Sequence, residues 1–67
     1  MRISYNKLWK MLIDKNMKKS DLKEKAGISS ASIAKLGKGD NITTDVLLRI
    51  CEAMDCHSDD IMETIED

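Results

Sequence analysis

Apolar residues recur three or four positions apart along most of the chain, in short segments separated by polar residues. This period is typical of helices that bury one face. It predicts five short helices, over residues 5–16, 19–26, 30–36, 44–54 and 59–65. Ahead of the first helix, Ile3 and Tyr5 alternate with polar neighbours, which indicates an extended segment. The predicted fold is all-α, as a single domain over residues 1–67.

The inward faces of these helices supply the predicted core. Its members are Tyr5, Leu8, Trp9, Leu12, Ile13, Leu22, Ala26, Ile28, Ile33, Leu36, Leu47, Ile50, Cys51, Met54, Ile61 and Ile65. Residues suited to helix ends lie between the segments. Gly27 can adopt the left-handed conformation that ends a helix, and Ser29, Thr43 and Ser58 are good N-caps. Residues 37–41 have the composition of a loop.

The composition narrows the possible functions. A chain of 67 residues buries only roughly 60% of its unfolded surface, which leaves little room for a deep catalytic cleft. No Ser-His-Asp or paired-carboxylate arrangement has the context that catalysis needs, so we expect no enzymatic activity and no cofactor. The sequence shows neither a membrane span nor a secretory signal. We therefore expect a cytoplasmic protein whose cysteines, Cys51 and Cys56, stay reduced.

Charge is distributed unevenly along the chain, although the net charge is only -1. Residues 1–40 hold ten basic and four acidic side chains, a balance of +6, whereas residues 41–67 hold one arginine and eight acidic side chains, a balance of -7. A phosphate backbone responds to the nearest face rather than to the total charge. This uneven distribution of charge fits a nucleic-acid partner, and taken alone it fits an ordinary solvated surface equally well.

The segment 17–36 has the organisation of a helix-turn-helix. Leu22 and Ala26 of one helix can meet Ile33 and Leu36 of the next, because Gly27 permits a sharp turn between them. The second helix, residues 30–36, could then enter a major groove with Ser30, Ala31, Ser32 and Lys35 outward. Helix starts and the following loop offer candidate phosphate contacts at Lys18, Lys19, Ser20, Ser29, Lys38 and Asn41.

The whole pattern resembles the Cro/cI-type helix-turn-helix family of phage and bacterial regulators, also called the xenobiotic-response-element (XRE) family. The matching positions are Leu8, Leu12, residues 17–22, 26–29 and 33–36, Gly39, residues 47–56, Asp60 and Ile61. The resemblance implies a lambda-repressor-like DNA-binding domain, in a short single-domain form, that binds double-stranded DNA as a homodimer. It implies phosphate contacts from Lys18, Lys19 and Lys38, and base contacts from Ser30, Ala31 and Lys35. Family members often carry long amide or arginine side chains at the first two reading positions, so readout here shifts to Lys35 and to DNA shape.

The leading hypothesis is therefore a sequence-specific transcriptional regulator, a repressor. A dimer would use the N-terminal segment or the C-terminal helices, with Met62 and Ile65 in the seam. The alternative hypothesis is a protein-interaction module of the same fold, in which the acidic last helix holds a basic partner as an antitoxin holds a toxin. The Cys51, Cys56 and His57 spacing matches no standard zinc arrangement, so we expect no metal site.

Overall fold

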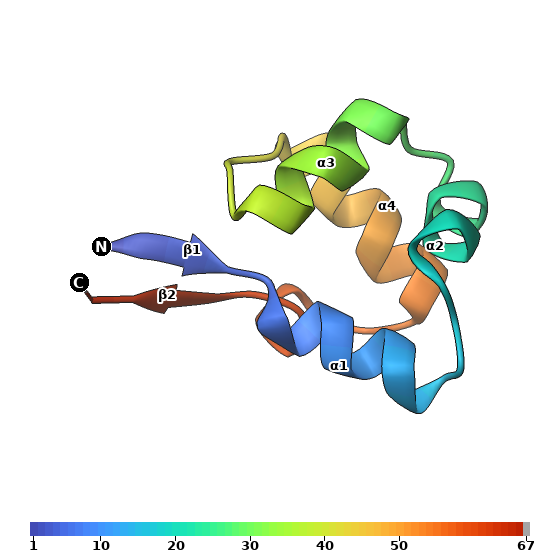
Figure 1. Ribbon diagram of the computed structural model, residues 1–67, viewed down its shortest axis with the longest axis horizontal. Helices are drawn as coiled ribbons and strands as arrows, with labels where there is room; N and C mark the ends of the chain where they lie inside the picture. The colour runs from blue at the N-terminus through green and yellow to red at the C-terminus, as the bar shows by residue number, and fades with distance from the viewer. Residues whose placement is uncertain (67) are drawn as a thin grey trace.

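The computed structural model describes residues 1–66. Within this part of the chain, four α-helices form the body of the molecule, and a two-stranded sheet extends from one end of it (Figure 1). In chain order the elements are β1 (Arg2–Ser4), α1 (Asn6–Asp14), α2 (Lys19–Ala26), α3 (Ser30–Lys38), α4 (Thr44–Met54), the 3-10 helix η1 (Ser58–Asp60) and β2 (Glu63–Ile65). The bounds predicted for the second and fourth helices are confirmed by α2 and α4.

The C-terminal segment is a strand, and the prediction of a fifth α-helix over residues 59–65 is wrong. A single 3-10 turn, η1, forms at the acidic start of that segment, and its Asp60 Oδ2 accepts the His57 backbone N–H at 3.0 Å. β2 then pairs antiparallel with β1, and Thr64 lies opposite Ile3. Thr64 and Ile65 are β-branched, which suits a strand. The partner strand lies at the other end of the chain, so a local helical period could not reveal this pairing.

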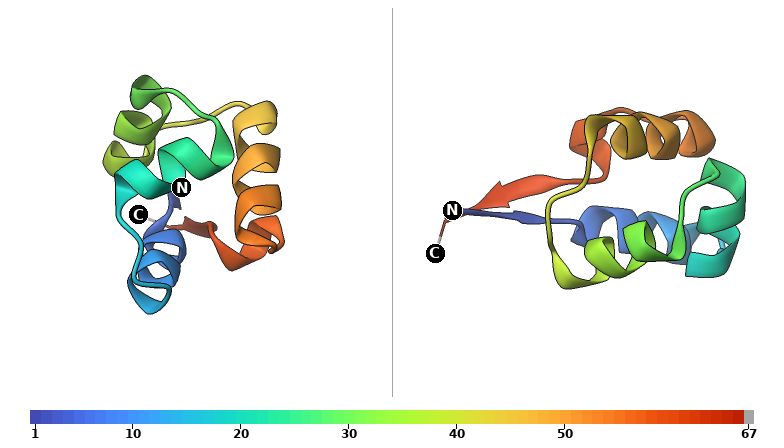
Figure 2. Two further views of the ribbon diagram at one scale, coloured as in Figure 1. Left: turned by 90° about the vertical axis from the view of Figure 1, so that its right-hand side faces the viewer. Right: turned by 90° about the horizontal axis from the view of Figure 1, so that it is seen from above.

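The extended segment predicted ahead of Tyr5 is confirmed as β1. Because β1 and β2 are antiparallel neighbours, the ribbon that they form carries the two ends of the described chain to the same side of the molecule (Figure 1). The view from above shows this ribbon projecting beyond the helices (Figure 2).

The first helix is shorter than predicted and has a narrower buried face. α1 ends at Asp14, and the chain turns at Asn16, whose φ of 56° is left-handed. Leu8 and Leu12 are buried, but Ile13 is 75% exposed, so the assignment of Ile13 to the inward stripe is wrong. One residue advances the helix by about 100°, which carries Ile13 away from the face that Leu8 and Leu12 share.

The third helix is longer than predicted. It continues through Gly37 to Lys38, so the predicted loop over residues 37–41 is wrong for its first two positions. The helix ends where Gly39 adopts a left-handed φ of 75°. The extra turn matters for the functional site, because it places Gly37 and Lys38 on the helix that follows the sharp turn.

Each α-helix contributes one large, fully buried side chain to the centre of the body. The fully buried residues are Leu8, Leu22, Leu36, Ile50 and, after η1, Ile61. Burial of each such side chain contributes about 1.5–3 kcal/mol to folding. Tyr5 closes the core at the sheet end and donates its hydroxyl hydrogen to the Asp40 carbonyl oxygen at 3.1 Å. In residues 1–66, every helix is too short or too polar to cross a membrane.

Candidate nucleic-acid interface

The turn between α2 and α3 holds the two helices in a helix-turn-helix arrangement. Gly27 ends α2 with φ 67° and ψ 36°, in the left-handed region. Ile28 then donates its backbone N–H to the Lys23 carbonyl oxygen at 3.1 Å and buries its side chain. Ser29 caps α3, because its Oγ accepts the Ser32 N–H at 3.2 Å. The start of α3 is therefore fixed relative to α2 by one left-handed residue, one buried anchor and one cap.

The outer face of α3 carries mostly small side chains. Ser30, Ala31, Ala34 and Lys35 are exposed, whereas Leu36 is buried in the core. Short side chains leave the helix slim on this side, and Lys35 is its only long outward side chain before the last turn. A slim face of this kind lets a helix approach the floor of a major groove closely.

The hydroxyl groups of Ser29 and Ser32 serve the cap of α3. Ser32 is half-buried, and its Oγ lies 3.2 Å from the Ser29 Oγ, in addition to the cap bond from its N–H. Both residues were predicted to face DNA. The structure brings them together at the start of the helix, and their hydrogen-bonding capacity is partly occupied there.

The start of α2 concentrates positive charge. Lys18, Lys19 and Ser20 are exposed there, at the positive end of the helix dipole. The Lys18 backbone N–H donates to Asp21 Oδ2 at 2.9 Å, which closes the helix end. Among residues 1–66, no carboxylate forms a salt bridge with the side chain of Lys18 or Lys19. An incoming anion would relieve the repulsion between these lysines and the helix end.

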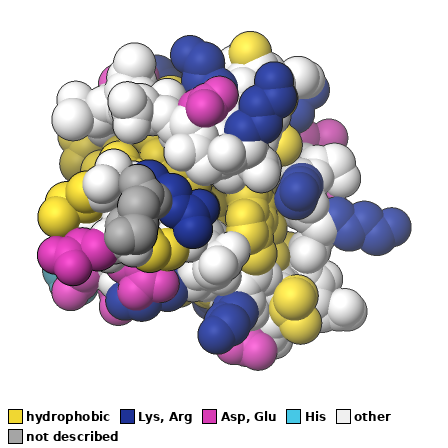
Figure 3. Space-filling view, turned by 60° about the vertical axis from the view of Figure 1, so that its left-hand side comes forward, with side chains coloured by type: hydrophobic (Ala, Val, Ile, Leu, Met, Phe, Trp, Pro, Cys, Tyr) yellow, Lys and Arg dark blue, Asp and Glu magenta, His cyan; other side chains and the backbone are white. Residues whose placement is uncertain are grey.

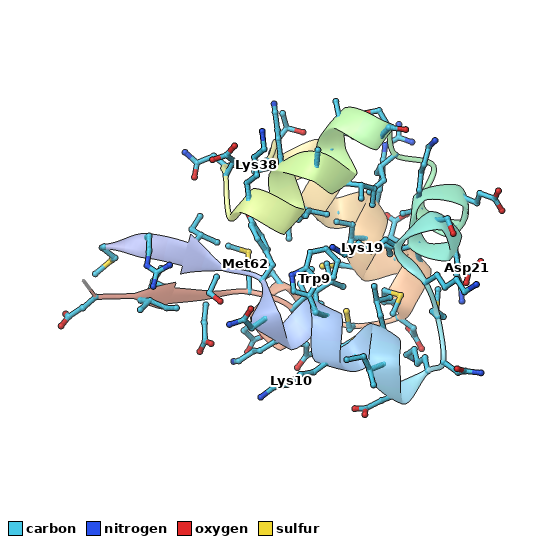
Figure 4. The ribbon with its side chains drawn as sticks, in the orientation of Figure 1. Trp9, Lys10, Lys19, Asp21, Lys38 and Met62 are labelled. Atoms are coloured by element: carbon cyan, nitrogen blue, oxygen red, sulfur yellow. The ribbon has the colours of Figure 1, made fainter. Side chains whose placement is uncertain are left out.

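Lys19 lies against two other helices. Its Nζ is 4.6 Å from the centroid of the Trp9 ring on α1 (Figure 4). On the side of α3, a Cβ added at Gly37 would lie 3.8 Å from the same Nζ. The sequence predicted Trp9 in the core and indicated no link to Lys19. The two residues lie on different helices and share no periodicity, so no sequence signal connects them.

The remaining predicted contacts lie near the end of α3. Lys38 is its last residue, and Asn41 is exposed in the loop that follows. A hollow of about 190 Å³ lies beside this end, between β1, the start of α1 and the end of α3, with Trp9, Gly37 and Lys38 among its walls. The predicted site residues thus form one group at the start of α2, one along α3 and one after α3.

Basic and acidic side chains are unevenly distributed over the molecule. Both views of Figure 2 place α3 and α4 on opposite sides of the body. Residues 1–40, which include α1 to α3, carry the excess of lysine, and the segment from α4 onward carries the excess of acidic residues. Figure 3 shows basic side chains over the upper and right-hand parts of one face, with acidic side chains most concentrated at the lower left. The uneven charge seen in the sequence is therefore also uneven in space.

The cysteines and the buried tyrosine do not form a reactive site. Burial raises the pKa of the Cys51 and Cys56 thiols, so both are protonated at neutral pH. Burial, followed by the nearby Asp40 carboxylate, also raises the pKa of Tyr5. Within residues 1–66, no three His, Cys, Asp or Glu side chains are grouped so that they could hold a metal ion.

The comparison with protein families decides what this arrangement represents. The family model of the Cro/C1-type HTH DNA-binding domain matches residues 7–67. The chain belongs to this family. It is therefore a DNA-binding domain of the kind found in transcriptional regulators, which are generally non-enzymatic.

A solved structure agrees with the family assignment. The chain is similar to the crystal structure of transcriptional regulator VanUg, Form II, with 52% sequence identity and a TM-score of 0.93. The similarity covers 98% of this chain and 88% of that one. No curated protein matches the chain.

Proposed function

We propose that this Cro/C1-type domain is a sequence-specific transcriptional repressor that inserts the first turns of α3 into the major groove of DNA. The observation that carries the proposal is the outer face of α3, where Ser30, Ala31 and Lys35 are exposed. The face is slim, it follows the turn at Gly27, and it belongs to the lysine-rich part of the chain, residues 1–40. These are the properties that a groove-reading helix requires.

The exposed residues divide into two roles in this proposal. Lys35 donates to a guanine edge, while Ser30 and Ala31 permit close approach and add short contacts. The start of α2 and the region after α3 position the domain on the backbone, through Lys18, Lys19, Ser20, Lys38 and Asn41. Ser29 and Ser32 act mainly through the cap of α3 and contact DNA with whatever hydrogen-bonding capacity remains.

We further propose that the domain binds DNA as a homodimer. A two-fold dimer reads two half-sites whose centres are about 34–36 Å apart, one turn of the double helix. Met62 and Ile65 are half-buried in and beside β2, so the sheet end remains our proposed seam. Repression follows from occupancy, because a dimer bound over a promoter excludes other proteins from the same groove.

Selection from a random DNA pool tests the proposal. We expect the full chain to enrich one sequence with two-fold symmetry and to bind it more tightly than random DNA at moderate salt. Lys35→Ala should cost about 1–3 kcal/mol on that site and relax the preference at one base pair in each half. Lys10→Ala is the matched control, since it removes the same charge from a side chain that points away from α3 (Figure 4). Equal affinity for selected and random DNA would refute sequence-specific binding.

Transcription in vitro tests the sign of regulation. A promoter that overlaps the selected sequence should lose activity as the protein is added, and a promoter with a scrambled sequence should not. An increase in transcript from the first promoter would show an activator instead.

The protein-interaction alternative has less support than the sequence suggested. It relied on an acidic C-terminal helix, and residues 63–65 form a strand in its place. The two functions remain separable by charge reversal, because Lys35→Glu combined with Lys38→Glu should abolish DNA binding and leave a partner contact at the C-terminal segment unchanged.

A further inference from the structure

The contact between Trp9 and Lys19 joins the first helix to the DNA-facing side of the domain. Trp9 is half-buried on α1 and packs against the core, so its ring is held in place. Lys19 is the first residue of α2, and its Nζ lies 4.6 Å from the ring centroid. A cation at this distance is attracted to the face of an indole ring. The core therefore sets the position of an exposed lysine.

The ammonium group also lies close to α3. A Cβ added at Gly37 would be at ordinary contact distance, 3.8 Å, from Lys19 Nζ. The end of the Lys19 side chain therefore lies against the Trp9 ring of α1 and near the backbone of α3, although its stem begins on α2.

The charge of Lys19 is held but not neutralised. Among the residues that the structure describes, no carboxylate forms a salt bridge with it. An aromatic face restrains a lysine while leaving its full positive charge and its N–H donors available to another partner. A salt bridge to Asp or Glu would instead cancel the charge. This difference matters at a surface that has to attract phosphate.

We propose that Trp9 is a positioning residue for DNA binding, which holds the Lys19 ammonium between α1 and α3 ready to contact a backbone phosphate. A free lysine side chain loses conformational entropy when it is fixed on a phosphate. In this protein part of that loss is incurred during folding, so the affinity for DNA is higher than a freely rotating lysine would give. The inference rests on the proposed DNA binding and adds a residue that does not itself contact DNA.

A double-mutant cycle on the selected DNA site tests the inference. The variants are Trp9→Leu, which keeps an apolar side chain but removes the ring, Lys19→Ala, and the double variant. Trp9→Leu should weaken binding about two- to tenfold, the fold-change expected when binding has to immobilise one freely rotating lysine side chain. Lys19→Ala should weaken binding more, and it should have a smaller effect in the Trp9→Leu protein than in the parent. Lys10 lies on the outer side of α1, so Lys10→Ala should have the same small effect on binding in the parent and in the Trp9→Leu protein.

Two further measurements separate positioning from a loss of folding. Trp9 is the single tryptophan of the chain, so its fluorescence reports on the ammonium above its ring. Lys19→Ala should change the emission of the free protein, and DNA should change the emission of the parent more than that of Lys19→Ala. If Trp9→Leu is poorly folded by circular dichroism, Trp9→Phe takes its place in the cycle, because it keeps a weaker aromatic face.

The outcomes distinguish the inference from the function on which it rests. Absence of DNA binding by the parent protein would refute the proposed function itself. Binding by the parent, with purely additive effects of the Trp9 and Lys19 changes or with emission unaffected by Lys19→Ala, would overturn the positioning role alone. Coupling between the two changes together with the fluorescence response would establish it.

Discussion

Substitution of Gly27 by alanine should destabilise the domain through the backbone alone. Gly27 has a φ of 67°, and an L side chain in that conformation costs about 1–2 kcal/mol. Steric conflict adds little, because the nearest atom to an added Cβ would be Arg49 Nη1 at 3.6 Å, the end of a flexible side chain. In a domain of this size, 1 kcal/mol lowers the melting temperature by about 4–8 °C. We therefore expect Gly27→Ala to melt about 4–16 °C below the parent.

Two matched substitutions isolate the cause. Gly27→Asn should recover part of the loss, since asparagine tolerates the left-handed region better than alanine does. Gly37→Ala should act in the opposite direction, because Gly37 lies inside α3 and an added Cβ would meet nothing closer than 3.8 Å. Alanine in place of glycine within a helix stabilises by about 0.5–1 kcal/mol, and a position in the last turn lies at the lower end of this range.

Thermal and urea unfolding followed by circular dichroism would measure these differences. The expected order of stability is Gly37→Ala, parent, Gly27→Asn and Gly27→Ala. Equal losses for Gly27→Asn and Gly27→Ala would mean that the Cβ clashes with Arg49, and a neutral Gly27→Ala would mean that the turn does not need a left-handed residue. Either result would refute the reasoning from backbone conformation.

Two further predictions concern the cap of α3 and the thiols. Ser29→Ala removes the acceptor for the Ser32 N–H and should cost about 1 kcal/mol of folding free energy, measured by urea unfolding. DNA affinity should also fall, because the start of α3 frays. Unchanged stability would contradict the role of Ser29 as a cap. Burial raises the pKa of Cys51 and Cys56 above 9.0, so the folded protein holds these protons more tightly than the unfolded chain. The contribution of the two thiols to the free energy of unfolding should therefore be fully present below pH 9 and decline above it. Replacing both cysteines by alanine should flatten this decline.

Local signals in the sequence predicted the central elements accurately. α2 and α4 have the predicted bounds, because local signals mark their ends. α2 has Asp21 in its first turn, α4 has a side-chain cap before its first residue, and both helices end at a left-handed residue. Thr43 illustrates this, since its Oγ1 accepts the Val46 N–H at 3.2 Å. The turn at Gly27 was predicted for the same reason, and the structure confirms it.

Features that depend on distant parts of the chain were missed. The strand at residues 63–65 exists through its pairing with residues 2–4. A helix was predicted there because acidic residues precede Ile61, which is buried as expected. The exposure of Ile13 depends on which face of α1 the other helices cover. No local period contains that information.

The candidate site shows the same division between local and distant information. Sequence reasoning named the exposed lysines and the small outward face of α3, which follow from helix phase and caps. It did not find how Lys19 is held, because its neighbours Trp9 and Gly37 belong to other helices. A protein that presents positive charge to DNA cannot restrain every lysine with a carboxylate, since the pairing would cancel the charge that binding uses. An aromatic face can restrain a lysine without that cancellation, so a residue that prepares such a surface for binding can lie half-buried beside it, as we propose for Trp9.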